Sequence, residues 1–227
     1  MNKLLKPFEY EELCALLSGD EGKTDGISDI EIQHLAWMGA QVPEGGDVVE
    51  IGSHRGKSIC AIGCGVRYAG QKDVRLFAVD LWTKGVGKTY AHYTTEETWN
   101  VFNEQVERMN LKDVVRPVMA SSMVAAKRRK RDIDLLFIDA SHTYRDVLRD
   151  FRIWSKFIPV GGRIAFHDFG TRFKGVERVV REEVMASGYW SVGDIYDRIW
   201  SAVRIGPYPP ALSPNDKEQE RHSEKGS

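Results

Sequence analysis

The chain has 227 residues, of which 42% are hydrophobic, and this suits one α/β domain with a buried core. Its formal net charge of -1 argues against a nucleic-acid partner, because phosphate binding needs a basic surplus or a basic stripe. Three cysteines cannot form a paired disulfide framework, no apolar run reaches membrane-spanning length, and residues 1–17 turn acidic too early for a secretory signal, so we expect a cytoplasmic protein with no membrane partner.

The first part of the chain is typical of a helical extension. Ser28 and Glu31 have the spacing of a capping box, which predicts a helix beginning at Asp29. We therefore divide the chain into a helical extension at 1–40, a main domain at 41–206 and a polar, disordered tail at 207–227. Helices in the extension could pair two subunits into a homo-oligomer.

Strand and helix patterns alternate through the main domain. Expected strands cover 47–51, 75–79, 114–119, 133–138 and 163–166, with a closing hairpin at 191–195 and 199–205. Expected helices cover 29–40, 57–68, 96–109, 121–130, 144–157 and 175–187. This alternation predicts an α/β fold with a Rossmann-like, doubly wound, mostly parallel seven-stranded sheet and an antiparallel edge strand. The stretch 82–95 is long enough to be a functional loop.

The most informative motif is Glu50-Ile51-Gly52-Ser53-His54-Arg55-Gly56-Lys57-Ser58, in which an apolar strand ends in an acid, a turn with two glycines and then a helix. In open α/β sheets, ligands bind beyond the carboxyl ends of the strands. A dinucleotide fingerprint has three glycines, and the middle one is missing here. The motif therefore favours a nucleotide-like cofactor other than a dinucleotide.

Polar residues also follow the next strands. Asp80 can accept both hydroxyls of a ribose, Ser121 can contact an adenine edge, and Asp139 ends the fourth strand. Each has a simpler explanation as a turn or helix-cap residue, but the set recurs at successive strand ends. The predicted cofactor-binding residues are Glu50, Gly52, Ser53, Gly56, Ser58, Asp80, Leu81, Ser121, Ser122 and Asp139.

A second motif runs from Asp139-Ala140-Ser141-His142 through Gly161-Gly162 to His167-Asp168. With the first motif, it resembles class I S-adenosylmethionine-dependent methyltransferases, in particular the small-molecule O-methyltransferases that include macrolide-sugar and cephalosporin-type tailoring enzymes. The similarity covers about residues 27–205. It implies S-adenosylmethionine as cofactor and, as acceptor, a hydroxyl of a small molecule such as a sugar or a natural-product intermediate.

The resemblance also implies a divalent cation, usually Mg²⁺, bound after the fourth and fifth strands. On this basis the candidate metal ligands are Asp139, His167 and Asp168, and the candidate catalytic residues are His142, as general base, and His167. His167 departs from the pattern, because metal-binding relatives often have an acid there and Mg²⁺ prefers oxygen ligands. A softer ion, or catalysis by His167 without a metal, fits this departure.

Two other functions remain open at this point: an NAD-type oxidoreductase, against which the missing glycine argues, and a non-catalytic relative that only binds a ligand. Gly85-Val86-Gly87-Lys88-Thr89 imitates the end of a phosphate-binding loop but lacks that motif's first glycine. The basic run at 127–131 is interpreted as a solvated helix end.

Overall fold

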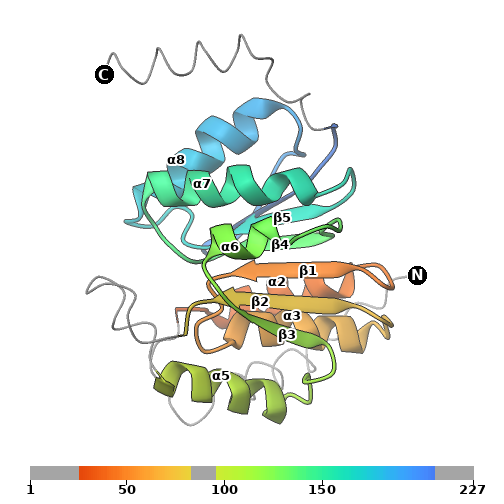
Figure 1. The fold of residues 1–227 in the computed structure, drawn as a ribbon. Coiled ribbons are helices and arrows are strands. Elements are labelled where there is room, and N and C mark those ends of the chain that lie inside the picture. Colours follow the sequence, from red (N-terminus) through yellow and green to blue (C-terminus); the bar gives the residue numbers. More distant parts are fainter. Residues whose placement is uncertain (1–25, 83–95, 208–227) are drawn as a thin grey trace.

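A computed structural model of the chain describes residues 26–82 and 96–207 (Figure 1). This part forms a seven-stranded sheet in the order β3-β2-β1-β4-β5-β7-β6. The strands are β1 (Asp47–Ile51), β2 (Arg75–Asp80), β3 (Val115–Met119), β4 (Leu135–Ile138), β5 (Arg163–Phe166), β6 (Asp194–Tyr196) and β7 (Ile199–Val203). The predicted tail, the phosphate-loop-like sequence and most of the predicted extension lie outside the described residues.

The strand directions agree with the predicted fold. Strands β1 to β5 pair in parallel, whereas β7 runs antiparallel to both β5 and β6. The doubly wound, Rossmann-like sheet is therefore confirmed, with its antiparallel pairing at the β6 edge. All seven strands were expected, and the largest difference is in β6, which begins three residues later than predicted because the chain at Trp190 makes only an isolated bridge to Arg204.

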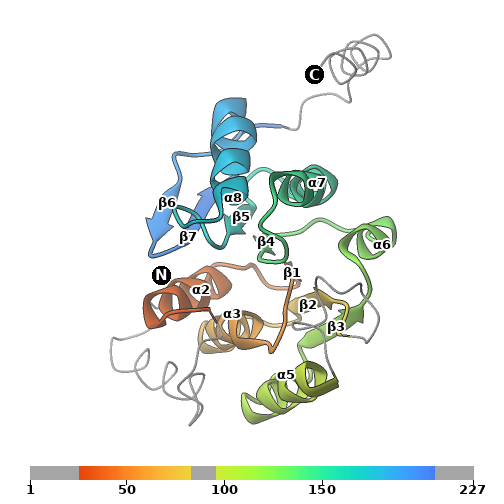
Figure 2. The ribbon, with the colours of Figure 1, turned by 90° about the vertical axis from the view of Figure 1, so that its left-hand side faces the viewer.

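Helices cover both faces of the sheet (Figure 2). They are α2 (Asp29–Ala40), α3 (Lys57–Tyr68), α5 (Glu96–Arg108), α6 (Ser122–Lys127), α7 (Tyr144–Trp154) and α8 (Lys174–Val179). Helices α2, α3 and α5 pack on one face, and α6, α7 and α8 on the other. Strand β1 is buried along its whole length. Val48 packs in the core under α2, α3 and α5, and Val49 and Ile51 pack in the core under α6, α7 and α8. Burial on both faces explains the apolar residues of β1 on both sides of Glu50, whereas the two buried acids of the strand, Asp47 and Glu50, lie near its ends.

Four helices end earlier than the sequence predicts: α5 by one residue, α7 at Trp154, where a 3₁₀ turn continues to Phe157, and α6 and α8 by more. The helix expected at 121–130 ends at Lys127, because the chain then turns back and the Arg129 guanidinium pairs with the buried carboxylate of Asp47. The helix expected at 175–187 changes after Val179 into a π turn and then a 3₁₀ turn. No helix among the described residues is long and apolar enough to cross a bilayer.

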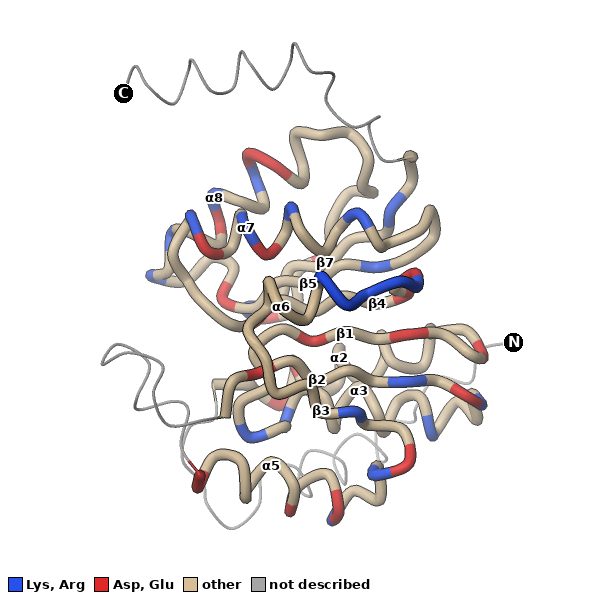
Figure 3. Tube along the Cα trace, in the orientation of Figure 1, with Lys and Arg blue, Asp and Glu red and all other residues tan. Residues whose placement is uncertain are grey.

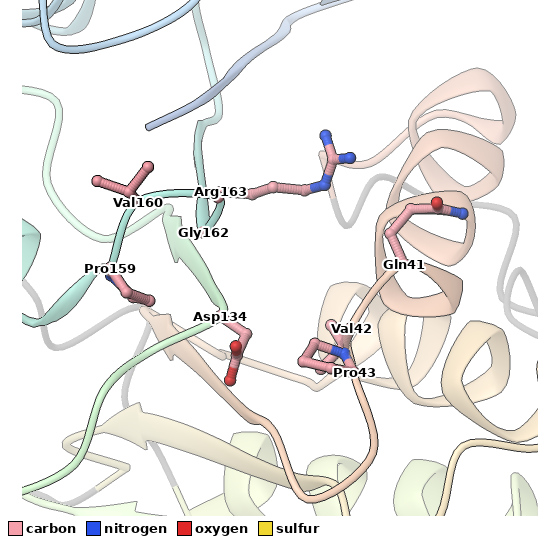
Figure 4. A pocket seen from close by; sticks show the side chains of 9 residues that line it. Gln41, Val42, Pro43, Asp134, Pro159, Val160, Gly162 and Arg163 are labelled. Atoms are coloured by element: carbon pink, nitrogen blue, oxygen red, sulfur yellow. The ribbon is translucent and has the colours of Figure 1, made fainter. Parts of the chain in front are cut away.

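The amino ends of β4 and β5 border a cavity of about 230 Å³ (Figure 4). Its polar side chains have structural partners. The Asp134 carboxylate accepts a hydrogen bond from the Asp47 N–H at 2.8 Å, and the Arg163 guanidinium lies 5.0 Å from the centre of the Trp37 ring. The candidate site residues lie at the other end of the sheet, where the parallel strands have their carboxyl ends.

Candidate functional site

Glu50 is a fully buried acid of the candidate site. It lies at the end of β1 with 0% of its surface exposed, and neither carboxylate oxygen makes a hydrogen bond of normal geometry to a described residue. Burial raises the pKa of Glu50 to about 8, and the hydroxyls of Ser53 and Ser58 oppose that shift only in part. A buried polar group without a partner costs roughly 1–3 kcal/mol. Glu50 is therefore suited to a ligand that brings positive charge or N–H donors.

Asp80 ties the turn after β1 to the end of β2. Its carboxylate accepts hydrogen bonds from the N–H of His54 at 2.8 Å and from the N–H of Leu81 at 2.5 Å. The indole N–H of Trp82 donates to the His54 carbonyl at 2.7 Å, which closes the same turn. Oδ1 of Asp80 also accepts the Trp82 N–H at 3.4 Å, whereas Oδ2 keeps a second lone pair for a ligand hydroxyl.

The two glycines of the first motif are required by close packing. At Gly52, φ is +93°, and a Cβ would lie 2.3 Å from the Asp139 carbonyl oxygen. At Gly56, φ is +85°, and a Cβ would lie 2.9 Å from the Phe102 ring. Gly52 thus lets the ends of β1 and β4 approach each other, which brings Glu50 and Asp139 to one region of the sheet edge.

The two predicted serines after β3 differ in their contacts. Ser121 caps α6, and its hydroxyl accepts the Val124 N–H at 3.4 Å. The Ser122 hydroxyl donates to Asp150 at 2.7 Å and accepts from the Trp154 indole at 2.8 Å. Because the Ser122 donor is already used within the protein, its side chain is less suited to contact a ligand than that of Ser121.

The residues of the second motif meet beyond β4 and β5, as expected for neighbouring strands. His142 Nε2 lies 2.8 Å from Asp168 Oδ2. His167 Nδ1 lies 3.0 Å from Asp139 Oδ1 and 3.6 Å from Asp168 Oδ2. Burial by itself raises the pKa of Asp168, but hydrogen bonds from His142 and His167 hold it well below its usual range.

His167 is enclosed by carboxylates on both sides of its ring. Its side chain is 5% exposed, and its Nε2 lies 3.2 Å from Oε1 of Glu31, which comes from α2. Burial by itself lowers the pKa of His167, but the charge and hydrogen bonds of the surrounding carboxylates, Asp139 first among them, raise it to about 12. The surrounding carboxylates thus favour the imidazolium form of His167.

Glu31 is a residue of this site that sequence reasoning missed. The predicted capping box with Ser28 is present, and the Glu31 carboxylate also accepts hydrogen bonds from the Arg198 N–H at 3.1 Å and the Arg198 guanidinium at 2.7 Å. It is fully buried. The capping spacing was the only signal in the sequence, and it does not reveal that the start of α2 lies beside the end of β5.

His142, which the sequence suggested as general base, lies beside two of the candidate metal ligands. Ligand atoms of Asp139, His142 and Asp168 all lie within 4.8 Å of one another. The His142 side chain is 37% exposed, and its ring stacks on Phe173 with 4.0 Å between ring centres. The accessible nitrogen donor is thus on His142, whereas His167 is buried behind the two acids.

The described fold and motifs match known proteins. Residues 49–169 match the model of a family described as a methyltransferase domain. An uncharacterised protein of Sinorhizobium fredii is 29% identical over 131 residues, which are 56% of this chain and 14% of that protein. An uncharacterised protein of Acanthamoeba polyphaga mimivirus is 46% identical over 37 residues, 16% of this chain and 17% of that protein. The matches thus span less than a fifth of the length of these two relatives.

Solved structures share the fold at low sequence identity. An O-methyltransferase from Bacillus cereus in complex with SAH has a TM-score of 0.61 at 16% identity, covering 88% of this chain and 93% of that one. The O-methyltransferase NovP has a TM-score of 0.63 at 15% identity, covering 79% and 81%. The O-methyltransferase TomG from Streptomyces achromogenes, in complex with SAM, has a TM-score of 0.61 at 14% identity, covering 89% and 92%.

Proposed function

The chain belongs to the methyltransferase-domain family, and we propose that it is an S-adenosylmethionine-dependent O-methyltransferase that acts on a hydroxyl of a small molecule. The observation that carries this proposal is the buried, unpartnered carboxylate of Glu50 beside Asp80 at the carboxyl ends of β1 and β2. The complexes of the Bacillus cereus and Streptomyces achromogenes O-methyltransferases with SAH and SAM support the choice of cofactor.

The residues at these strand ends fit the polar groups of S-adenosylmethionine. Its ammonium group supplies the positive charge that the buried Glu50 carboxylate lacks, and a ribose hydroxyl suits the remaining lone pair of Asp80 Oδ2. Ser121, at the end of β3, is the candidate for contact with adenine. When bound, the cofactor supplies an activated methyl group, so the protein needs mainly to align the acceptor with it.

His142 is the candidate general base that removes the proton of the acceptor hydroxyl. With Nε2 directed at the Asp168 carboxylate, the ring carries its proton on that nitrogen and leaves Nδ1 as the base. Asp168 would then stabilise the imidazolium that forms when Nδ1 takes the hydroxyl proton. Stacking on Phe173 restricts the ring plane of His142 and so the direction in which Nδ1 accepts.

The same three side chains also fit a divalent cation. Asp139, His142 and Asp168 offer two carboxylates and one imidazole within a small volume, a donor set better suited to Mn²⁺ or Zn²⁺ than to Mg²⁺. A cation held there would lower the pKa of an acceptor hydroxyl. Whether His142 acts as a base or as a metal ligand, the buried pair of Glu31 and His167 would hold Asp139 and Asp168 in position.

A labelled methyl donor tests the reaction. The protein is incubated with S-adenosylmethionine carrying a tritiated methyl group and a panel of sugars, phenols, amines and thiols, with Mn²⁺ or with a chelator. We expect transfer of the methyl group to hydroxylated compounds. We expect no NAD-dependent oxidation of these compounds, the alternative activity that the family match disfavours. Transfer only to amines or thiols would contradict the proposal, and cofactor binding without transfer to any compound would favour a non-catalytic relative.

A further inference from the structure

A second cavity, of about 360 Å³, lies on the face of the sheet that α6 and α7 cover, at a distance from the carboxyl-end site. Helix α6 has only six residues, so it leaves part of β1, β2 and β3 uncovered. The apolar lining consists of Val49, Phe77, Val79, Val118, Ala125 and Trp154. The rim comes from the basic strap, by which we mean residues 128–131 after α6, together with Arg75 and Asp47.

Arg129 holds the basic strap against the apolar lining of the cavity. Its side chain is 9% exposed and pairs with Asp47, and its guanidinium lies 5.2 Å from the centre of the Phe77 ring. It also donates to the carbonyls of Arg131 and Asp132. Arg129 is therefore a structural residue, and its neighbours in the strap are held at the mouth of the cavity.

Two cations of the strap, Arg128 and Lys130, are not neutralised by a neighbouring acid. The side chains of Arg128 and Lys130 are exposed and make no hydrogen bond or ion pair with any described residue. The Arg131 side chain is 61% exposed, lies 3.8 Å from Oδ2 of Asp47 and donates to the Gly45 carbonyl at 3.3 Å. Asp47 is the only acid among the residues that line the cavity, and it already pairs with Arg75 and Arg129. Figure 3 shows the strap as a continuous blue stretch between α6 and β4. Positive charge thus stands in excess over an apolar floor.

We propose that this cavity binds a small organic anion with an apolar body. Its phosphate, sulfonate or carboxylate group lies among Arg128, Lys130 and Arg131, and its body lies on Phe77 and Val118. The volume is at the lower end of the range for small-molecule pockets, roughly 300–1,000 Å³. A nucleic acid fits less well, because the excess charge is confined to one strap and the floor offers no row of donors for a phosphate backbone.

A fluorescent probe with this chemistry tests the proposal without depending on the enzyme's acceptor. The probe is 1-anilinonaphthalene-8-sulfonate, titrated into the full-length protein with excess S-adenosylhomocysteine so that the cofactor site is filled. The double variant Arg128→Glu/Lys130→Glu should weaken probe binding at least about tenfold, since four units of charge change near the sulfonate. Val118→Trp, which fills the floor, should weaken binding with the charges intact.

The matched control is Lys112→Glu/Lys174→Glu, which makes the same change in net charge at two exposed lysines that do not line the cavity. It should leave the dissociation constant within about twofold, as expected for distant sites. Equal affinities for the wild type and the strap variant would overturn the proposal. Displacement of the probe by a single-stranded RNA oligonucleotide, but not by decanoate, would overturn it in favour of a nucleic-acid surface.

Discussion

Nε2 of His167 lies 3.2 Å from Oε1 of Glu31, so a carboxylate on α2 faces the histidine that follows β5. Since Nδ1 of the same ring faces Asp139 at 3.0 Å, His167 bridges a fully buried acid and an acid of the candidate site. Glu31 lies outside residues 49–169, the part that matches the methyltransferase-domain model. The site is thus built partly by a segment that the family motifs do not include.

Glu31→Gln should destabilise the protein far more than Ser28→Ala. Removing the Glu31 charge leaves the buried imidazolium of His167 with one carboxylate fewer and removes the ion pair of Glu31 with Arg198, which we expect to cost about 3 kcal/mol. Ser28→Ala removes the helix cap and an exposed hydrogen bond to Asp197, and it should cost about 1 kcal/mol. Urea unfolding measures both free energies. Equal losses would mean that Glu31 serves only as a cap.

Gly52→Ala should be much more damaging than Gly161→Ala. The two glycines have nearly the same φ, +93° and +92°, but a Cβ at Gly161 would meet no atom within 4 Å, whereas at Gly52 it would meet the Asp139 carbonyl. Gly161→Ala, the control, should lower the free energy of unfolding by roughly 1–2 kcal/mol, because alanine is strained in the left-handed backbone conformation. The Gly52 variant should lose more, because β1 and β4 must move apart. Similar melting temperatures for the two variants would contradict the role assigned to this close approach.

The sequence predicted those parts of the structure that depend on local pattern. Alternating apolar segments indicated the strands, and acids at strand ends indicated Asp80, Asp139 and Asp168, because the carboxyl ends of parallel strands share one edge. The proximity of His142 to both Asp139 and Asp168 was not predictable, since it depends on how the chain turns after β5, where Asp168 has a left-handed φ of +61°. The early end of α6 depends on a long-range pair, Arg129 with Asp47.

Glu50→Gln should stabilise the protein without bound cofactor, and more so at higher pH. Burial raises the pKa of Glu50 to about 8, so between about pH 4.5 and 8 the native state holds a proton that the unfolded state has lost. The wild type therefore loses stability as the pH rises through this window, by on the order of 3 kcal/mol, and the glutamine variant does not.

Unfolding free energies at pH 5 and pH 8 measure this difference. The gap between Glu50→Gln and wild type should widen toward pH 8. A gap that is the same at both pH values would show that Glu50 is already ionised in the protein without cofactor.

His142→Ala separates the two roles of the acid–histidine cluster. If Asp139, His142 and Asp168 bind a cation, calorimetric titration with Mn²⁺ should show a site that His142→Ala weakens roughly 10–100-fold. Asp194→Asn, an exposed acid on β6, is the control and should bind Mn²⁺ as the wild type does. Wild-type affinity in His142→Ala would exclude His142 as a ligand and leave it only the role of base.

The central claim is that S-adenosylmethionine binds at the carboxyl ends of β1 and β2, and calorimetric titration of the full-length protein with this cofactor tests it most directly. The wild type should bind one molecule per chain, and Asp80→Asn should weaken binding by about tenfold or more, since it removes a charged acceptor for the ribose hydroxyls. Asp73→Asn, an exposed acid whose left-handed φ of +58° asparagine tolerates, should bind like the wild type. No heat of binding to the wild type, or equal affinity in Asp80→Asn, would contradict the account.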